Sequence, residues 1–349
     1  MGHTTQRRRR RLNVLLIDAD SRIPNLALMK LSAYHRSIGD SVDIVMLNAP
    51  YRSDRKRYGY IPPFGYDKVY CSIIFKSNAN CVICDGVDIG GTGYDINVKL
   101  PQHVEAMRPD YSIYPDCDRS YGFITRGCIR RCSFCVVPEK EGRIHKVAEV
   151  SDIIQHKKVE FLDNNILAYE NHEDVLNELI DIGIKCRFTQ GLDIRLLTKS
   201  NSDLLSRLNY MGDYTFAFDS ADYIGAVERG VALLKWASPW TIKFFVYVHP
   251  DMSDSDVVFR LDWLKAHKCL PYVMRDEACY ASESNGFYAD VAAYANQPAF
   301  FRKIDFRDYM PIRWPGNSKR VKEMADKWDH ARAQSIHYTE EKKKIEHTN

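Results

Sequence analysis

The sequence predicts an α/β protein: an N-terminal domain with a Rossmann-like parallel sheet, a partial (β/α)6 barrel of the TIM type, and a C-terminal helical region. Three observations lead to this fold class. The N-terminal strands are apolar almost throughout, as in parallel sheets covered by helices. From residue 118 on, strands and helices alternate repeatedly. The 349 residues have room for one large domain or two ordinary ones.

Composition describes a globular protein with nearly balanced charge. Apolar residues make up 45% of the chain and the formal net charge is +3. No uncharged apolar run approaches the ~20 residues that a membrane helix needs, and the N-terminus lacks the pattern of a signal peptide. Ten cysteines without a secretory signal are typical of a reducing compartment. We therefore expect a cytoplasmic protein without a membrane segment.

Residues 1–11 form a basic leader that contains five consecutive arginines, residues 7–11. Such a run can contact nucleic acid or an anionic surface. A solvated, disordered leader is the interpretation that we favour. The composition gives no further support to nucleic acid as a partner.

Residues 12–110 contain the elements of the first domain. We expect strands at 12–18, 41–47 and 68–75 and a helix at 23–38, which ends at the Gly39-Asp40 pair. A connector with three prolines, residues 100–117, follows. We place the domain boundary in this connector.

A glycine-rich turn, residues 89–95, closes the first domain. Gly90 and Gly91 follow a strand, where glycine lets the backbone approach a phosphate or a flat cofactor closely. A tight connection between domains would need the same residues. In the same domain, Cys81 and Cys84 form a C-x2-C pair, which we interpret as two buried thiols on a strand in preference to half a zinc site.

Cys128, Cys132 and Cys135 follow the spacing C-x3-C-x2-C after an apolar strand-like run. A [4Fe–4S] cluster in an electron carrier is held by four cysteines. Three close cysteines with no fourth nearby therefore predict a cluster with one open iron, which can bind a substrate-like ligand. Zinc held by the three cysteines and His145 is the alternative, although no second zinc knuckle is present.

This spacing, with Phe134 directly before the last cysteine, resembles the cluster loop of the radical S-adenosylmethionine (SAM) enzymes. The resemblance implies that the three cysteines bind a [4Fe–4S] cluster and that its open iron binds the amino and carboxylate groups of SAM. Reductive cleavage then yields methionine and a 5′-deoxyadenosyl radical. Phe134 matches the residue whose backbone lies near the adenine. A reductant such as flavodoxin or ferredoxin is the implied partner, and the substrate is not indicated.

Residues 12–110 resemble the cobalamin-binding-type domain that precedes many radical SAM barrels. In that family a Gly-Gly pair lies near the cofactor tail, which makes Gly90 and Gly91 candidate cofactor-binding residues. The cobalt-ligating pattern Asp-x-His-x-x-Gly is absent, because residues 18–23 read DADSRI. Cobalamin bound without a protein ligand stays an alternative, and the chain would then be a cobalamin-dependent methyltransferase.

The partial barrel is expected over residues 118–280. We predict strands at 121–125, 159–162, 186–189, 214–218, 241–248 and 270–274, with helices at 147–156, 174–182 and 204–208. Six strands are too few for a closed barrel of eight and match the open barrel typical of the radical SAM family. In such folds the chemistry lies at the carboxyl ends of the strands.

Asp163, Asn164 and Asn165 end the second of these strands. In the radical SAM family this position contacts the amino group of SAM, and carboxylate and amide oxygens are suitable acceptors for an ammonium group. A helix N-cap followed by a turn would use the same residue types.

Gln190, Asp193 and Arg195 end the third predicted strand, and Asp219 ends the fourth. Asp193 is a candidate acceptor for ribose hydroxyls, and Arg195 a candidate bidentate partner of the SAM carboxylate. An Asp–Arg ion pair that holds the loop is the competing interpretation. Asp219 is a candidate catalytic residue that faces the substrate.

The remaining chain, residues 281–349, is expected to be helical. Aromatic residues at helical spacing in 299–310 predict a core-facing helix, and the charged segment 318–349 predicts a solvated helix with a frayed tail. A third class of function stays open alongside the two enzymes. It is a non-catalytic metal-binding module that recognises nucleic acid through the arginine run.

Overall fold

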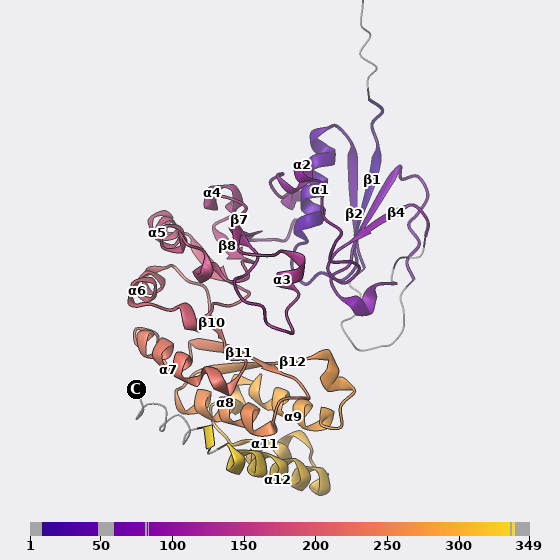
Figure 1. Cartoon of the computed structure of the whole chain (residues 1–349). Coiled ribbons are helices and arrows are strands. Elements are labelled where there is room, and N and C mark those ends of the chain that lie inside the picture. Colours follow the sequence, from indigo (N-terminus) through magenta and orange to yellow (C-terminus); the bar gives the residue numbers. More distant parts are fainter. Residues whose placement is uncertain (1–8, 48–58, 81, 83, 336, 339–349) are drawn as a thin grey trace, which may run out of the picture. The chain divides into compact units, whose positions relative to one another are not determined.

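The computed structural model describes residues 9–47, 59–80, 82, 84–335 and 337–338. The chain is a mixed α/β protein with parallel sheets, and it divides into two compact units (Figure 1). The first unit comprises Met1–Gly122 and Ser151–Lys157, and the second comprises Phe123–Val150 and Lys158–Asn349. The boundary between the two units therefore lies after Gly122, a few residues beyond the connector 100–117 in which it was predicted.

The first unit contains a four-stranded sheet in the order β2-β1-β3-β4, in which every neighbouring pair is parallel. Helix α1 contacts β1, β2 and β3 and so covers one face of the sheet (Figure 1). The parallel sheet expected from the sequence is therefore present, and its Rossmann-like classification stays a prediction. The elements of this unit are β1 (Asn13–Asp18), α1 (Leu26–Ser37), β2 (Ser41–Met46), β3 (Lys68–Ser72), β4 (Val87–Gly90), α2 (Gln102–Glu105) and β5 (Ser120–Gly122).

Strand β1 is buried on both faces, which explains its continuous apolar sequence. Val14 and Leu16 pack with Leu28 and Met29 of α1, whereas alternate residues of β1 pack in a second cluster on the opposite face. Successive side chains of a strand point to opposite faces, so a central strand needs apolar residues at every position.

The arginine run is in part tied to this unit. Residues 1–8 lie outside the described part of the chain. Arg9 pairs with Asp40 at 3.0 Å, and Arg10 pairs with Asp67 at 2.9 Å. Asp40 also accepts hydrogen bonds from His35 and from the backbone N–H of Leu12. Burial opposes the charge of Asp40, but these hydrogen bonds outweigh it and lower its pKa to about 2.

The second unit carries the cysteine loop, a series of parallel strands and the C-terminal helices. Its elements are β6 (Thr125–Arg126), α3 (Val137–Lys140), β7 (His145–Lys146), β8 (Lys158–Phe161), α5 (His172–Ile182), β9 (Lys185–Phe188), α6 (Lys199–Arg207), β10 (Tyr214–Ala217), α7 (Ile224–Leu233), β11 (Ile242–Val248), α8 (Asp254–Ala266), β12 (Leu270–Arg275), α9 (Asn285–Ala295), α10 (Pro298–Phe301), α11 (Phe306–Arg313) and α12 (Ser318–Gln334). The short α4 (Val150–Ile153) lies where the chain passes between the units.

Strands β8 to β12 follow one another in parallel. Regular ladders join β8 to β9, β10 to β11, and β11 to β12. Two isolated parallel bridges, Cys186 with Tyr210 and Leu192 with Phe216, join the segments around β9 and β10. The carboxyl ends of these strands therefore lie along one edge, where the predicted polar residues follow them.

The predicted strand at 121–125 is wrong in its continuity. The chain forms β5 up to Gly122 and then, after a break, β6, which pairs antiparallel with β7. The break occurs where the backbone N–H groups of Ile124 and Thr125 bond to Asp163 instead of continuing a ladder. The predicted helix at 147–156 is reduced to α4.

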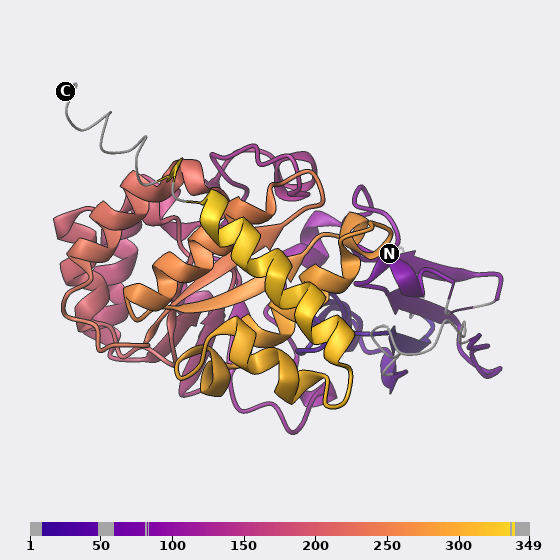
Figure 2. The ribbon, with the colours of Figure 1, turned by 90° about the horizontal axis from the view of Figure 1, so that it is seen from below.

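The C-terminal region differs from its prediction in two ways. The predicted helix at 299–310 is divided into α10 and α11, although Phe301, Phe306 and Tyr309 are buried as expected. Helix α12 is not merely solvated, since it buries Met324 and Trp328 and packs on α8 and α11 (Figure 2). The many charged residues of this helix led to the prediction of a solvated helix, although its apolar residues form a buried stripe. No helix in the described part of the chain is long and apolar enough to cross a membrane.

Candidate metal and cofactor site

The loop that carries the three cysteines is closed at its base. Strands β6 and β7 pair there, and the backbone N–H of Cys128 donates to the carbonyl of Gly142 at 3.2 Å. Gly127 has a φ of +83°, and a Cβ at this position would lie 2.4 Å from the carbonyl oxygen of Arg143. Only glycine allows the two ends of the loop to cross this closely. The sequence 127–143 is therefore built as a closed loop.

Cys128 and Cys132 are partly buried, and Cys135 is exposed; all three thiols are free. Burial raises the pKa of the Cys132 and Cys135 thiols, and the nearby Asp219 and neighbouring thiols raise it further. Within the described residues, no three His, Cys, Asp or Glu side chains are grouped tightly enough to hold a single metal ion. A [4Fe–4S] cluster makes a different demand, because each cysteine binds a different iron.

Asp163 fixes the start of the cysteine loop. It is 1% exposed and accepts hydrogen bonds from Thr125 N at 2.6 Å, Thr125 Oγ1 at 2.7 Å and Ile124 N at 3.1 Å. Burial raises the pKa of this carboxyl to about 6, although the bonds from Thr125 and Ile124 oppose the rise. Both carboxylate oxygens are engaged, so the structure gives Asp163 a role that holds the loop.

Asn164 and Glu141 fix the end of the same loop. Asn164 Nδ2 donates to Glu141 Oε2 at 2.6 Å, and the backbone N–H of Gly127 donates to the same oxygen at 3.0 Å. Arg126 Nη1 donates to Glu141 Oε1 at 2.9 Å. Burial opposes the charge of Glu141, but these contacts outweigh it and lower its pKa. Glu141 was not singled out from the sequence, where it appears only as one of several charges in a loop.

Asn165 and Asp219 present buried acceptor atoms that lack a partner among the described residues, Oδ1 in each case. Asn165 is 4% exposed, and its Nδ2 lies 3.9 Å from Cys128 Sγ. Asp219 follows β10; burial raises its pKa, and its charge influences both Cys132 and Cys135. A buried oxygen without a donor is uncommon in a native protein. These two atoms therefore point to a ligand with hydrogen-bond donors near the cysteines.

Asp193 links the cysteine loop to the segment after β9. Its Oδ2 accepts from Arg130 Nε at 2.7 Å and from Arg195 Nη2 at 3.1 Å, and its Oδ1 accepts from Arg195 Nε at 2.7 Å. Arg195 also lies over the ring of Tyr223. The structure thus contains the Asp–Arg ion pair that the sequence left as one of two interpretations, with Arg130 as an additional member. Gln190 is exposed and is not joined to this group.

Phe134 stacks on Tyr247 of β11, with ring centroids 3.9 Å apart and an interplanar angle of 19°. Tyr247 in turn donates to Asp276 Oδ2 at 2.8 Å. The aromatic pair connects the segment of the last cysteine to strand β11. The sequence identified Phe134 but gave no signal for its partner, because the two residues are far apart in the chain.

A buried arginine braces the strand ends beside Asp219. Arg260 is 0% exposed; its Nη1 donates to the carbonyls of Phe218 at 2.8 Å and Tyr247 at 3.0 Å. Asp256 accepts from Arg260 Nε at 2.6 Å and from the backbone N–H of Ala221 at 2.7 Å. The pair thereby fixes the backbone on both sides of Asp219. Sequence reasoning missed it because Arg260 lies inside a helix and its backbone partners, Phe218 and Tyr247, come from distant strands.

In the first unit, the turn at Gly90 and Gly91 packs against its own domain. Gly91 has a φ of +103°, and a Cβ there would lie 2.2 Å from the carbonyl oxygen of Ile73. Asp20, which follows the central strand β1, accepts from the backbone N–H groups of Ile74 at 2.7 Å and Phe75 at 2.9 Å, directly after Ile73. The space that Gly91 leaves is thus occupied by backbone, which gives the glycine a structural reason of its own.

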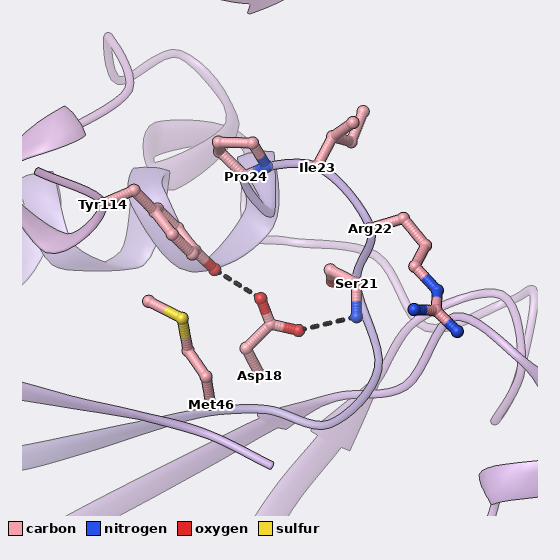
Figure 3. Close-up of a pocket in the computed structure, with 7 residues that line it drawn as sticks. All are labelled: Asp18, Ser21, Arg22, Ile23, Pro24, Met46 and Tyr114. Atoms are coloured by element: carbon pink, nitrogen blue, oxygen red, sulfur yellow. Dashed lines mark hydrogen bonds between the residues drawn. The ribbon is translucent and has the colours of Figure 1, made fainter. Parts of the chain in front are cut away.

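A small open pocket lies at the carboxyl ends of β1 and β2, between Asp18, Arg22, Met46 and Tyr114 (Figure 3). Asp18 accepts from Tyr114 Oη at 2.6 Å and from the backbone N–H of Ser21 at 3.0 Å, so both of its oxygens are engaged. The volume is about 180 Å³, below the roughly 300–1,000 Å³ of typical cofactor pockets.

Cys81 lies outside the described residues, and Cys84 is exposed, contrary to the prediction of a buried thiol.

A scan against models of protein families finds no match for this chain, and a search among curated proteins finds no significant match. The assignment of function therefore depends on the residues and contacts described above.

Proposed function

We propose that this chain is a radical SAM enzyme, with a [4Fe–4S] cluster bound by Cys128, Cys132 and Cys135. The observation that carries the proposal is the combination of three cysteines on one closed loop with the unpaired acceptors of Asn165 and Asp219 beside them. Three thiol ligands match a cluster with one open iron. When bound, the cluster would supply the electron that cleaves SAM and generates the 5′-deoxyadenosyl radical.

The protein's own residues would hold and orient these groups. Asn165 Oδ1, and not the whole trio 163–165, is the acceptor that we assign to the ammonium group of SAM, since Asp163 and Asn164 are engaged with the loop. Asp219 Oδ1 is the second buried acceptor and would face the donors of SAM or of the substrate. Arg195 would act on the SAM carboxylate only by leaving part of its pairing with Asp193.

We further propose that β8 to β12 belong to an open barrel of the TIM type. The parallel ladders and the two bridges between the segments around β9 and β10 support this arrangement. The cysteine loop would then lie at the carboxyl end of the barrel, where such folds carry their chemistry. A flavodoxin or ferredoxin would deliver the electron.

We do not assign cobalamin to this chain. The backbone of Ile73 fills the space beside Gly91, Asp20 is engaged with the backbone of Ile74, and the pocket described above is too small for a corrinoid. These residues do not fit a cofactor tail. The first unit would therefore serve the enzyme without a cofactor of its own.

Anaerobic iron and sulfide analysis tests the proposal. Reconstituted wild-type protein is expected to hold about four irons per chain. Replacing Cys128, Cys132 and Cys135 together by Ala should abolish iron binding. The matched control replaces three buried cysteines, Cys186, Cys269 and Cys279, by Ala; the soluble fraction of this variant should bind iron as the wild type does. Stoichiometric zinc without iron in the wild type would refute the proposal.

A further inference from the structure

The side-chain amide of Asn165 contacts a proposed cluster ligand with its nitrogen and presents a buried, unpaired oxygen. Its Nδ2 donates toward Cys128 Sγ at 3.9 Å, and its Oδ1 has no donor among the described residues. The residue is 4% exposed, so bulk water competes little for either atom. One amide group therefore faces both the sulfur and the position where a ligand with donors would bind.

The neighbouring contacts hold the backbone of Asn165 in place. Asn165 precedes the short helical turn Ile166–Ala168, and its carbonyl accepts from the backbone N–H of Ala168 at 3.1 Å. Asp163 and Asn164 fix the preceding backbone to the two ends of the cysteine loop. These bonds fix the backbone from which the side chain of Asn165 reaches Cys128.

A hydrogen bond to a cluster-ligating sulfur stabilises the more negative, reduced state and raises the reduction potential. Amide hydrogen bonds also reinforce one another: a donor that binds Oδ1 polarises the amide and strengthens its N–H as a donor. Occupation of Oδ1 would thus be transmitted to the sulfur without any movement of the backbone.

We propose that Asn165 is a positioning residue that relays the binding of SAM at Oδ1 to the potential of the cluster through Cys128. This inference rests on the proposed function. The backbone N–H of Arg130 also donates to Cys128 Sγ, at 3.4 Å. That contact does not involve the side chain of Asn165 and should persist in its variants.

The test compares full-length, anaerobically reconstituted proteins by redox titration with and without SAM and by SAM binding. Asn165→Leu removes both polar atoms at similar size. We expect normal iron content, a roughly tenfold lower ratio of reduced to oxidised cluster at fixed potential (about 59 mV for one electron), weaker SAM binding, and a smaller shift of the potential on SAM addition.

Two further variants keep the test decisive. Asn165→Asp keeps the acceptor and loses the N–H, so we expect SAM binding to persist while the potential falls and its response to SAM diminishes. Asn164→Leu is the control for disturbance of the loop, because its amide donates to Glu141 and not to sulfur; its potential should fall less than that of Asn165→Leu, and its response to SAM should persist.

The outcomes separate this inference from the proposed function. Wild-type protein that takes up no iron would refute the proposed function. Iron-loaded Asn165→Leu or Asn165→Asp with the potential and the SAM response of the wild type would refute the relay alone. A shift of the same size in Asn164→Leu would also refute it, because general disturbance of the loop would then explain the change.

Discussion

Replacing Asp163 by Ala tests how the cysteine loop is held. The change leaves three buried donors without a partner: the N–H groups of Ile124 and Thr125 and the hydroxyl of Thr125. Each unsatisfied buried donor costs about 1–3 kcal/mol. The loss of hydrogen bonding alone would thus destabilise the protein by about 3–9 kcal/mol.

An opposing effect comes from the charge of the same carboxyl. Burial raises the pKa of Asp163 from 3.8 to about 6, which corresponds to roughly 3 kcal/mol at about 1.4 kcal/mol per pH unit. Because the folded-state pKa exceeds the unfolded one, this carboxyl stabilises the fold fully below pH 3.8. That contribution is lost as the pH rises through about 6. The alanine variant has no carboxyl at this position, so its stability does not fall with pH for this reason.

The two effects predict a net destabilisation of about 3 kcal/mol at pH 7.5, larger by about 1–2 kcal/mol at pH 5. Urea unfolding of the full chain without cluster, followed by circular dichroism at both pH values, measures it. Asp181→Ala on the exposed end of α5 is the control and should change stability by less than about 0.5 kcal/mol. A cost below about 1 kcal/mol at pH 5, or one that grows with pH, would refute the reasoning.

Three further predictions concern other parts of the molecule. Arg260→Met leaves the Asp256 carboxylate without its charged partner, and urea unfolding should show a loss of about 3–5 kcal/mol in the free energy of unfolding. An unchanged urea midpoint would contradict the role of Arg260 in holding the strand ends. The pKa of Asp40 is held at about 2, below its usual 3.8, so its stabilisation is present above pH 3.8 and lost toward pH 2; Asp40→Asn should flatten the acid unfolding curve. Gly91→Ala should lower the thermal midpoint, because the positive φ alone costs about 1–3 kcal/mol and the new Cβ also clashes with the backbone of Ile73; the iron content should not change. A loss of iron would instead connect this turn to the cluster.

The sequence predicted the longer parallel strands of both units well because their apolar patterns are continuous, whereas it missed the break after Gly122. Strand β1 was expected at 12–18 and spans Asn13–Asp18, and β11 was expected at 241–248 and spans Ile242–Val248. The helix before Gly183 also ends as predicted, since Gly183 adopts a φ of +68° there. These signals are local, so a single sequence is sufficient to read them.

The contacts around the cysteines were not predictable in the same way. The spacing of the cysteines and the polar residues after the strands are local patterns. The partners Glu141, Arg130 and Tyr247 depend on residues that meet only in the folded chain. Asp163 and Asn165 are two positions apart and both polar, yet Asp163 holds the loop and Asn165 presents an unpaired oxygen. Only the structure distinguishes them.

Reductive cleavage of SAM tests the central claim most directly. Anaerobically reconstituted protein, prepared without any corrinoid, is mixed with SAM and dithionite and assayed for 5′-deoxyadenosine and methionine. The account predicts that both products form with the wild type and that neither forms when Cys128, Cys132 and Cys135 are changed together to Ala. Wild-type protein that holds four irons per chain and forms no 5′-deoxyadenosine, or forms it only when cobalamin is added, would contradict it.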